Sequence, residues 1–355
     1  MSTPYSAVWP ALAAAALFGA STPLVKLLVG EFPPLLLAGL LYLGSGLGLA
    51  AIRLLRDRGW KASGLAAGEW RWLAGAIVFG GVLGPVLLVA GLTRIDAGPA
   101  SLLLNLESVF TALLAWVVFR ENVDRRIVLG MLLIVAGGVA LAWPAGGSAV
   151  PDAIGLSAIA AACLCWAIDN NLTRHVSGSD ALFIAGAKGW TAGLVNICLA
   201  FLLGATLPAW PTAGAAMAVG LAGYGLSLVF FVLALRGLGT ARTGAYFSTA
   251  PFIGAAIAIL LLDEATTAPF WVAACLMGMG VWLHLTERHA HTHTHEPLEH
   301  THPHVHDAHH RHAHDFEWDG REPHSHWHRH EVLTHSHPHY PDLHHRHRHD
   351  PAADS

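Results

Sequence analysis

Histidine is concentrated at the C-terminal end of this chain. All of its 25 histidines except His175 and His284 lie in residues 288–355, often at every second position. Alternate residues of an extended chain lie on the same side, so neighbouring imidazoles can bind one metal ion. Imidazole nitrogen suits nickel, cobalt, zinc and Cu(II), and the absence of cysteine from this tail disfavours Cu(I). The sequence therefore predicts a tail that binds a divalent metal such as Ni, Co, Zn or Cu.

The predicted metal ligands lie in the stretches where histidines alternate most clearly. They are His289, His291, His293, His295, His302, His304, His306, His335, His337 and His339. Proline, threonine and acidic residues between them predict a tail that is disordered without metal. Three roles fit this composition: a sensor or buffer that feeds or gates a metal exporter, a store unrelated to the cargo, or a segment that becomes cationic as histidines protonate near about pH 6.5. No other cofactor is required.

The residues before the tail have the composition of a membrane protein. Of the whole chain, 54% of the residues are hydrophobic and only 12% are charged, although the tail is very polar. A helix needs roughly 20 apolar residues to span a bilayer. Ten segments qualify: residues 8–29, 34–54, 71–92, 98–119, 126–143, 153–176, 181–204, 212–235, 242–262 and 267–286. The predicted fold is an all-α integral membrane protein with ten transmembrane helices and a disordered His-rich tail.

The distribution of lysine and arginine predicts the orientation, because positive loops remain on the cytoplasmic side. One set of alternate loops contains Arg53, Arg56, Arg58, Lys61, Arg71, Arg120, Arg125, Arg126, Arg174, Arg236 and Arg242. The other set contains only Arg94. With ten helices, both termini and the tail are predicted to be cytoplasmic, in a cell inner (plasma) membrane.

The apolar part of the chain repeats itself. Val109-Phe110-Thr111-Ala112, which runs on to Arg120-Glu121, is similar to Phe252-Ile253-Gly254-Ala255, which runs on to Asp263-Glu264. We therefore predict two five-helix repeats, residues 1–146 and 147–287, before the tail at 288–355. Because each repeat has an odd number of helices, the second is predicted to be inverted in the membrane. Secondary transporters with this plan have their binding site at the repeat interface.

One segment of the first repeat resembles a known family. The residues from Ala100 to Trp116, followed by Arg120-Glu121, closely resemble the fourth-helix signature of EamA-type transporters in the drug/metabolite transporter superfamily. The resemblance covers nearly all of residues 8–286. It implies a ten-helix carrier, often an exporter of metabolites, amino acids or drugs, that works by alternating access, but it implies no particular substrate. The family usually has proline after the glutamate, whereas this chain has Ser108 there and Pro251 at the matching place of the second half, so a proline kink is predicted only in the second half.

Glu107 is an ionisable residue near the middle of the fourth predicted helix. A carboxylate at that depth costs about 2.5–3.5 kcal/mol on insertion scales, so it needs a partner or a function. We predict that it either lines a substrate cavity or holds this helix against its neighbours as a hydrogen-bonded carboxyl, with Asn105 as a candidate partner.

Asp169 and Lys188 are predicted to pair. Each stands eight residues from the turn at 177–180, so both lie about 12 Å from the same membrane surface at about 1.5 Å per residue. With Asn170 and Asn171, they are predicted to line the central cavity and to change partners when substrate or a proton binds. The alternative is a structural salt bridge. At an offset of 148 residues, positions 169–171 fall opposite Ser21-Thr22-Pro23, which predicts a weakened helix at the binding site.

These observations predict an exporter linked to divalent metals such as Ni, Co or Zn. One alternative is an exporter of metabolites, amino acids or drugs whose tail only buffers metal, and another is a membrane metal sensor or store that transports nothing. The sequence contains no ATP-binding loop or nucleophile motif, so no enzyme is predicted, and its charge pattern does not indicate nucleic-acid binding. The predicted partners are a small-molecule or metal-ion substrate and the lipid bilayer.

Overall fold

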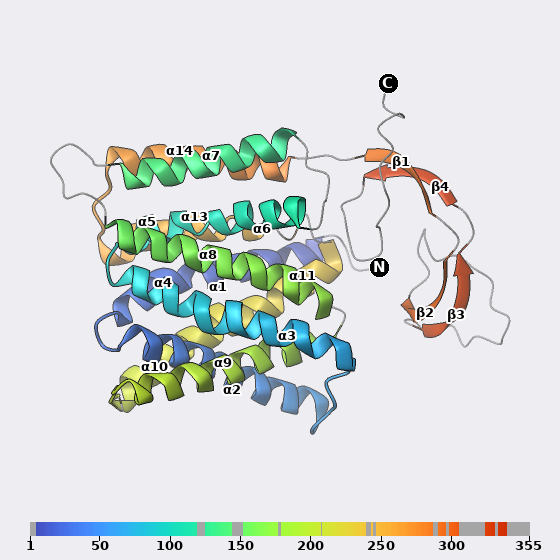
Figure 1. The fold of residues 1–355 in the computed structure, drawn as a ribbon, viewed down its shortest axis with the longest axis horizontal. Coiled ribbons are helices and arrows are strands. Elements are labelled where there is room, and N and C mark those ends of the chain that lie inside the picture. Colours follow the sequence, from blue (N-terminus) through green and yellow to red (C-terminus); the bar gives the residue numbers. More distant parts are fainter. Residues whose placement is uncertain are drawn as a thin grey trace. The chain divides into compact units, whose positions relative to one another are not determined.

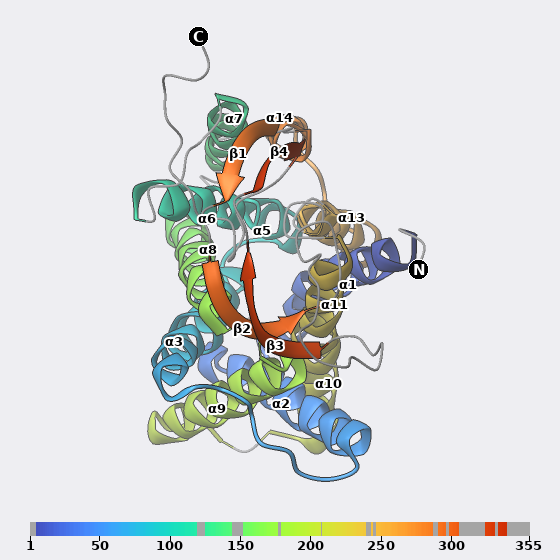
Figure 2. The same ribbon diagram turned by 90° about the vertical axis from the view of Figure 1, so that its right-hand side faces the viewer.

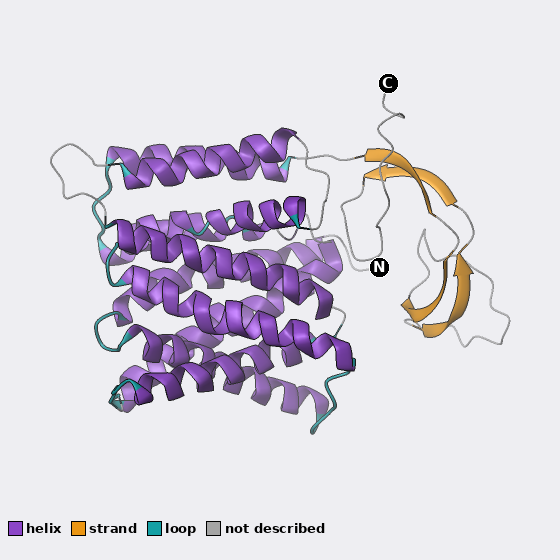
Figure 3. Cartoon of the chain, viewed as in Figure 1, coloured by secondary structure: helices purple, strands orange, loops and turns teal. Residues whose placement is uncertain are grey.

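The computed structural model describes residues 5–118, 125–143, 152–176, 179–206, 208–238, 243, 246–286, 290–295, 298–304, 324–330 and 333–338. The chain divides into two compact units, Met1–Glu287 and Arg288–Ser355. Figure 1 colours the chain from the N-terminus to the C-terminus, and Figure 3 shows that the described parts of the first unit are helices joined by loops and that those of the second are strands.

The first half of the helical unit contains five membrane segments, some of them made of several consecutive helices. The elements are α1 (Tyr5–Leu28), α2 (Pro34–Asp57), η1 (Ala67–Glu69), α3 (Trp70–Ala76), η2 (Ile77–Leu83), α4 (Gly84–Leu92), α5 (Ala97–Leu103), α6 (Leu106–Val117) and α7 (Arg125–Ala142).

The second half follows the same order. Its elements are α8 (Ala153–Thr173), η3 (Arg174–Val176), α9 (Ala181–Leu202), α10 (Trp210–Gly220), η4 (Leu221–Leu226), α11 (Ser227–Leu238), α13 (Ala250–Leu262) and α14 (Ala268–Leu285). Within the described residues of the whole chain, nine segments are long and apolar enough to cross a membrane, and α13 is a shorter apolar helix. Nine of the ten predicted spans are therefore confirmed to within a few residues, whereas the described helix of the predicted span 242–262 is the shorter α13. The first unit is a multi-pass membrane domain.

The third membrane segment of each half contains a π-helical turn, η2 in the first and η4 in the second. Both turns are rich in glycine, with Gly80 and Gly81 in η2 and Gly223 and Gly225 in η4. Pro85 follows η2, and because proline cannot donate to the helix ladder, the chain before it widens locally. These turns, which recur at matching places in the two halves, were not among the features predicted from the sequence.

The fourth membrane segment is broken between α5 and α6 at residues 104–105. The hydroxyl of Ser108 donates to the carbonyl oxygen of Asn105 at 2.7 Å. At the matching place before α13, the hydroxyl of Thr249 donates to the carbonyl oxygen of Tyr246 at 2.6 Å. A side-chain hydroxyl thus competes for a backbone carbonyl at both breaks. The first half is broken even though it has Ser108 where the family has proline.

The helices α1 and α8 are continuous where the sequence predicted a weakened helix. The structure has α-helix through Ser21-Thr22-Pro23 and through Asp169-Asn170-Asn171. A single proline such as Pro23 removes only one helical hydrogen bond, which neighbouring helices can tolerate in a membrane. That prediction is therefore wrong, and the backbone irregularities lie in the third and fourth segments instead.

The helices of the two halves pack in a symmetric way: the main contacts have counterparts in which the two halves change places. The second segments of the halves, α2 and α9, pack along each other, and so do the fifth segments, α7 and α14 (Figures 1 and 2). The first segment of each half packs against the third and fourth segments of the other: α1 against α11 and α13, and α8 against α4 and α6. The two halves therefore interlock instead of forming separate bundles.

Glycines permit the closest of these approaches. A Cβ atom at Gly46 of α2 would collide with the backbone of α9 at Gly189, and one at Gly189 would collide with Gly46. Gly130 of α7 and Gly280 of α14 face each other in the same way. Small residues let helix backbones approach closely in a bilayer, where packing replaces the hydrophobic effect as the force between helices.

The described parts of the tail are strands. They are β1 (Ala290–His295), β2 (Leu298–His304), β3 (His324–His330) and β4 (Leu333–Pro338). β1 pairs with β4 and β2 pairs with β3, both antiparallel. This differs from the predicted disorder, and an extended conformation fits the two-residue alternation of the histidines. Of the predicted metal ligands, His289, His306 and His339 lie outside the described residues.

Candidate functional site

Asp169 of α8 and Lys188 of α9 form an ion pair inside the membrane domain. The Lys188 Nζ lies 2.6 Å from each carboxylate oxygen of Asp169, and each residue is 6% exposed. The hydroxyl of Thr173 also donates to Asp169 Oδ1, at 2.8 Å. Two buried charges are tolerated in lipid only when they are paired and hydrogen-bonded, as they are here. The structure thus brings together the two residues that the sequence predicted to pair.

The π-turn η2 shapes this site. Both α8 and α9 pack against η2, and a Cβ atom at Gly80 would collide with the Asp169 carboxylate. The carbonyl oxygen of Gly80 accepts hydrogen bonds from the Tyr42 hydroxyl at 2.7 Å and from Trp166 Nε1 at 3.1 Å. A π-turn disturbs the regular ladder and leaves carbonyl groups for other donors. The prediction of this ion pair used only the neighbouring positions of the two helices that contain Asp169 and Lys188. The structure shows in addition that the absence of a side chain at Gly80 makes room for the contact.

Glu107 and Asn170 form a second polar contact beside the ion pair. Asn170 Nδ2 donates to Glu107 Oε1 at 2.7 Å, which joins the first turn of α6 to α8. Glu107 is half-buried and Asn170 is exposed. Because Asn170 follows Asp169 directly in α8, the two contacts form one polar site, defined here as Glu107, Asn170, Asp169 and Lys188.

The other two predicted site residues are not part of this cluster. Asn105 is buried and its amide donates to the carbonyl oxygen of Leu102 at 2.9 Å and contacts the sulfur of Met277 at 3.9 Å. The Asn171 amide donates to the carbonyl oxygen of Ala167 at 2.8 Å, within its own helix. The predicted partnership of Asn105 with Glu107 is therefore wrong. The turn at residues 104–105 places the Asn105 amide against α14, away from α8.

The second half contains a counterpart of the contact between Gly80 and Asp169. At the offset of 148 residues, Ser21 of α1 corresponds to Asp169, and a Cβ atom at Gly223 of η4 would collide with the Ser21 side chain. Phe18 and Trp166, which have the same offset, meet edge to face with ring centroids 6.1 Å apart. Equivalent positions of the two halves therefore meet at the centre of the bundle, and only one of the two π-turns faces a charge.

An aromatic cluster that was not predicted from the sequence lies beside the site. Tyr224 of η4 packs edge to face on Phe18, with centroids 6.1 Å apart, and lies 5.5 Å from the ring of Tyr42. Phe247 lies 5.3 Å from Phe18. In the sequence, the signal for this cluster is the pair of glycine-rich segments, each of which packs beside aromatic residues of another helix. That signal can be recognised only when the two halves are aligned at the offset that relates Phe18 to Trp166.

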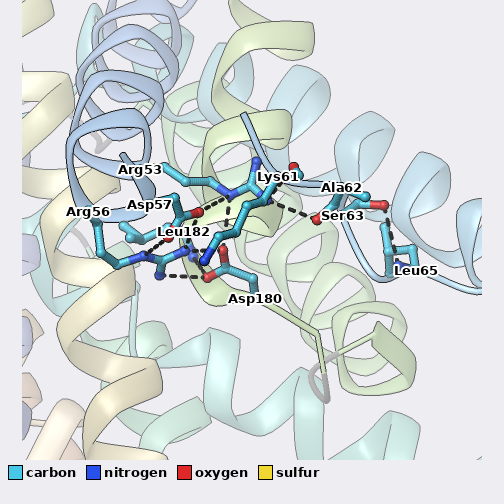
Figure 4. A network of polar contacts seen from close by, with 9 residues as sticks. All are labelled: Arg53, Arg56, Asp57, Lys61, Ala62, Ser63, Leu65, Asp180 and Leu182. Carbon is cyan, nitrogen blue, oxygen red and sulfur yellow. Dashed lines mark hydrogen bonds and ion pairs between the residues drawn. The ribbon is translucent and has the colours of Figure 1, made fainter. Parts of the chain in front are cut away.

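A network of charges joins the end of α2 to the start of α9, as Figure 4 shows. Asp180 accepts hydrogen bonds from Arg56 at 2.6 Å and Arg53 at 3.0 Å, and its carboxylate also caps α9 by accepting from the backbone of Leu182 at 3.1 Å. Hydrogen bonding, above all from Arg56, lowers the pKa of Asp180 to about 2. Arg53 is 7% exposed and also donates to the carbonyl oxygen of Lys61. This network fixes the two helices that meet along their lengths.

The described residues of the membrane domain offer no ready-made metal centre. Among the residues that the structure describes with their side chains, no three His, Cys, Asp or Glu side chains gather as metal ligands. In the polar site, the only carboxylates are Glu107 and Asp169, and Asp169 is already neutralised by Lys188.

Comparison with known proteins agrees with this architecture. A family model for the EamA-like transporter family matches residues 6–143 and 153–286, one match for each half. An uncharacterized transporter of Methanothermobacter thermautotrophicus is 26% identical over 284 residues, which cover 75% of this chain and 82% of that protein. A probable 4-amino-4-deoxy-L-arabinose-phosphoundecaprenol flippase subunit ArnE of Pseudomonas aeruginosa is 42% identical over 112 residues, which cover 30% of this chain and 93% of that protein.

A crystal structure of another protein superposes on 80% of this chain and 98% of its own, with a TM-score of 0.60 and 19% identity, and so shares the fold. The family assignment rests on the two family matches, which together span most of the membrane domain. The chain belongs to the EamA-like transporter family and is a multi-pass membrane transporter.

Proposed function

We propose that this protein is a secondary transporter that exports a small organic metabolite by alternating access between two inverted five-helix repeats. The observation that carries the proposal is the 2.6 Å ion pair between Asp169 and Lys188, buried in the membrane domain beside the Glu107–Asn170 contact. Ionisable residues inside a membrane domain mark transport pathways by default. The exchange-related packing of the two halves, with a π-turn in each third segment, supports the inverted repeat.

The ion pair also supports a cargo class. Breaking a buried ion pair leaves two uncompensated charges, so the pair stays closed unless a ligand supplies both counter-charges. A cargo with an ammonium group and an acidic group can do so, with the ammonium on Asp169 and the acid on Lys188. Glu107 and Asn170 then bind further polar groups of the same molecule. The name of the Pseudomonas relative refers to a compound that contains both an amino group and a phosphate.

A bare divalent metal is less well supported as cargo. Divalent cations bind to sets of several oxygen, nitrogen or sulfur ligands, and the described part of the membrane domain contains no such set. We therefore favour the metabolite over the metal-ion cargo that the sequence suggested first. Metal binding remains our proposal for the tail, which would buffer or sense Ni, Co, Zn or Cu beside a carrier of organic cargo.

The orientation is part of the same proposal. The loop charges favour an inner (plasma) membrane location with both termini in the cytoplasm. In that orientation the network of Arg53, Arg56 and Asp180 lies at the cytoplasmic ends of α2 and α9, and the histidine tail is exposed to cytoplasmic metal.

Export by cells expressing matched variants tests the proposal. Metabolites in the medium and in the cells are compared by untargeted mass spectrometry, and cell metals by elemental analysis, for the wild type, Asp169→Asn and Lys188→Met. Asp152→Asn is the control, because Asp152 forms an exposed ion pair with Arg94 at 3.0 Å. All four proteins are compared at equal amounts in the membrane.

We expect the wild type and Asp152→Asn to move the same organic compound into the medium, and the two site variants to fail. Export that is unchanged in Asp169→Asn and Lys188→Met would show that the ion pair is only structural. A fall in one cell metal without any change in metabolites would replace the organic cargo by that metal.

A further inference from the structure

The strands of the tail place histidines directly opposite one another. In the β1–β4 ribbon, His291 pairs with His337 and His293 pairs with His335. In the β2–β3 ribbon, three such pairs follow one another: His300 with His328, His302 with His326 and His304 with His324. The two strands of each ribbon are antiparallel, so histidines that come later in the first strand lie opposite histidines that come earlier in the second. The tail therefore has two histidine ladders, one in each ribbon.

The register separates the histidines from the other residues. Alternate positions of a strand lie on opposite faces, and in each ribbon the His–His pairs occupy every second position. The positions between them pair other residue types. In the first ribbon Thr292 is opposite Ser336 and Thr294 is opposite Thr334. In the second, Thr301 is opposite Trp327 and Pro303 is opposite Ser325 between the histidine pairs, and Glu299 is opposite Arg329 just before them. One face of each ribbon is thus a histidine face.

The pairs between and beside the histidine pairs favour this register for a reason that does not involve metal. Opposite charges and Thr–Thr or Thr–Ser pairs directly across an antiparallel ladder each stabilise it, by about 0.2–1 kcal/mol. A shift by one residue would move every histidine to the other face of its strand and bring histidines opposite Thr, Ser, Glu or Arg. Glu299 and Arg329 would also lose their opposite positions.

From this juxtaposition we infer that the tail forms two separate sites for a borderline divalent cation of the zinc type, one on the histidine face of each ribbon. The inference deepens our proposal that the tail binds metal. Directly opposite positions have Cβ atoms about 4.5–5.5 Å apart, and two adjacent pairs supply four imidazoles, the number that tetrahedral Zn2+ takes. The first site uses His291, His293, His335 and His337. The second uses the middle pair of the β2–β3 ladder, His302 and His326, together with an adjacent pair.

Each site needs both of its strands. Alternate positions of a strand lie about 6.8 Å apart, so even β3, which has four histidines at alternate positions (His324, His326, His328 and His330), brings at most two or three imidazoles near one ion. The two strands, or arms, of a ribbon together complete the set. Binding therefore links the two strands of a ribbon and stabilises their pairing, so metal binding and folding of the tail are coupled in one equilibrium. Each imidazole must be neutral to bind, so affinity falls as the pH drops below about 6.5.

Titration of the full-length protein in detergent micelles with Zn2+ alone tests the inference by isothermal calorimetry at neutral pH. We expect two tight sites per chain. His293→Ala should weaken one of them by about tenfold or more, and adding His335→Ala, at the opposite position, should cost little further, because the site is already broken. His302→Ala and His326→Ala should do the same to the other site.

The informative comparison is between pairs of substitutions. His293→Ala with His335→Ala should weaken one tight site about as much as His293→Ala alone and leave the other intact, whereas His293→Ala with His302→Ala should weaken both. The control is His310→Ala with His312→Ala, which removes two alternating histidines from the segment between the arms and should leave both sites intact. If all three double variants lose Zn2+ binding equally, affinity depends only on the number of histidines and the two-site inference is wrong.

The titration does not measure transport. A loss of the two-site pattern would leave the proposed carrier function untouched, and a failure of Asp169→Asn to affect export would leave the metal sites untouched.

Discussion

The ammonium group of Lys188 lies 2.6 Å from both carboxylate oxygens of Asp169, so one cation bridges the two oxygens. Gly80 makes this contact possible, because any side chain there would occupy the position of the carboxylate. The ion pair and the π-turn are therefore one structural unit, in which the backbone irregularity leaves room for the charged site.

The stability of the ion pair gives the first prediction. Asp169→Asn or Lys188→Met alone should lower the free energy of unfolding by about 3–5 kcal/mol, because each leaves an unpaired buried charge. The double variant should recover most of this loss, since neutral partners of similar size need no counter-charge. Thermal unfolding in detergent micelles measures all three proteins. Equal destabilisation by the double variant and the worse single variant would mean that packing, not charge, holds this site.

Gly80→Ala gives the second prediction. The added methyl group should displace the Asp169 carboxylate and disturb η2, so export should fall at least about tenfold. Gly214→Ala in α10 is the matched control, because a Cβ atom there would meet no other atom within 4 Å. That substitution should leave export unchanged and be neutral or slightly stabilising. Normal export by Gly80→Ala would show that the position of Asp169 does not matter for transport.

Glu107→Gln separates the charge of Glu107 from its hydrogen bond. Glutamine retains an oxygen that can accept from Asn170 and has nearly the same size. We expect the thermal unfolding temperature to stay close to that of the wild type and export to be lost, because the cargo or the coupling ion uses the charge. A large fall in unfolding temperature with normal specific activity would instead assign Glu107 a structural role.

Asp180 gives a prediction about pH. Its pKa of about 2 lies below the ordinary value of 3.8, so the charged form is favoured in the folded protein and stabilises it at every pH above about 4. This contribution disappears as the pH falls from about 4 to about 2. Because the side chain is 23% exposed, solvent screening reduces it to about 1 kcal/mol. Unfolding of Asp180→Asn and the wild type should differ at neutral pH and converge in that window. A difference that persists at pH 2 would contradict this.

Much of the fold could be predicted from hydrophobicity alone, because a membrane helix needs a long apolar segment that is easy to recognise. The pairing of Asp169 with Lys188 could also be predicted, since equal distance from one turn sets equal depth. The π-turns could not, because their glycines are equally typical of close helix packing. The partner of Glu107 was missed because the break at residues 104–105 rotates Asn105 away from it, and local sequence does not give that rotation.

The histidine tail shows a different limit. Its alternation indicates metal ligands and an extended chain, but several connectivities of such a repetitive segment have the same pattern. The register that brings His293 opposite His335 depends on which arms pair, and this comes from the structure alone.

Export by the double variant of Asp169→Asn and Lys188→Met tests the central claim most directly. This protein has no unpaired charge at positions 169 and 188 and should fold and reach the membrane like the wild type. Its medium is compared with that of wild-type and Asp152→Asn cells by mass spectrometry, at equal amounts of protein. We predict that the double variant is stable and exports none of the compound that the other two export. A stable double variant that exports at the wild-type rate would contradict the claim that Asp169 and Lys188 bind the cargo.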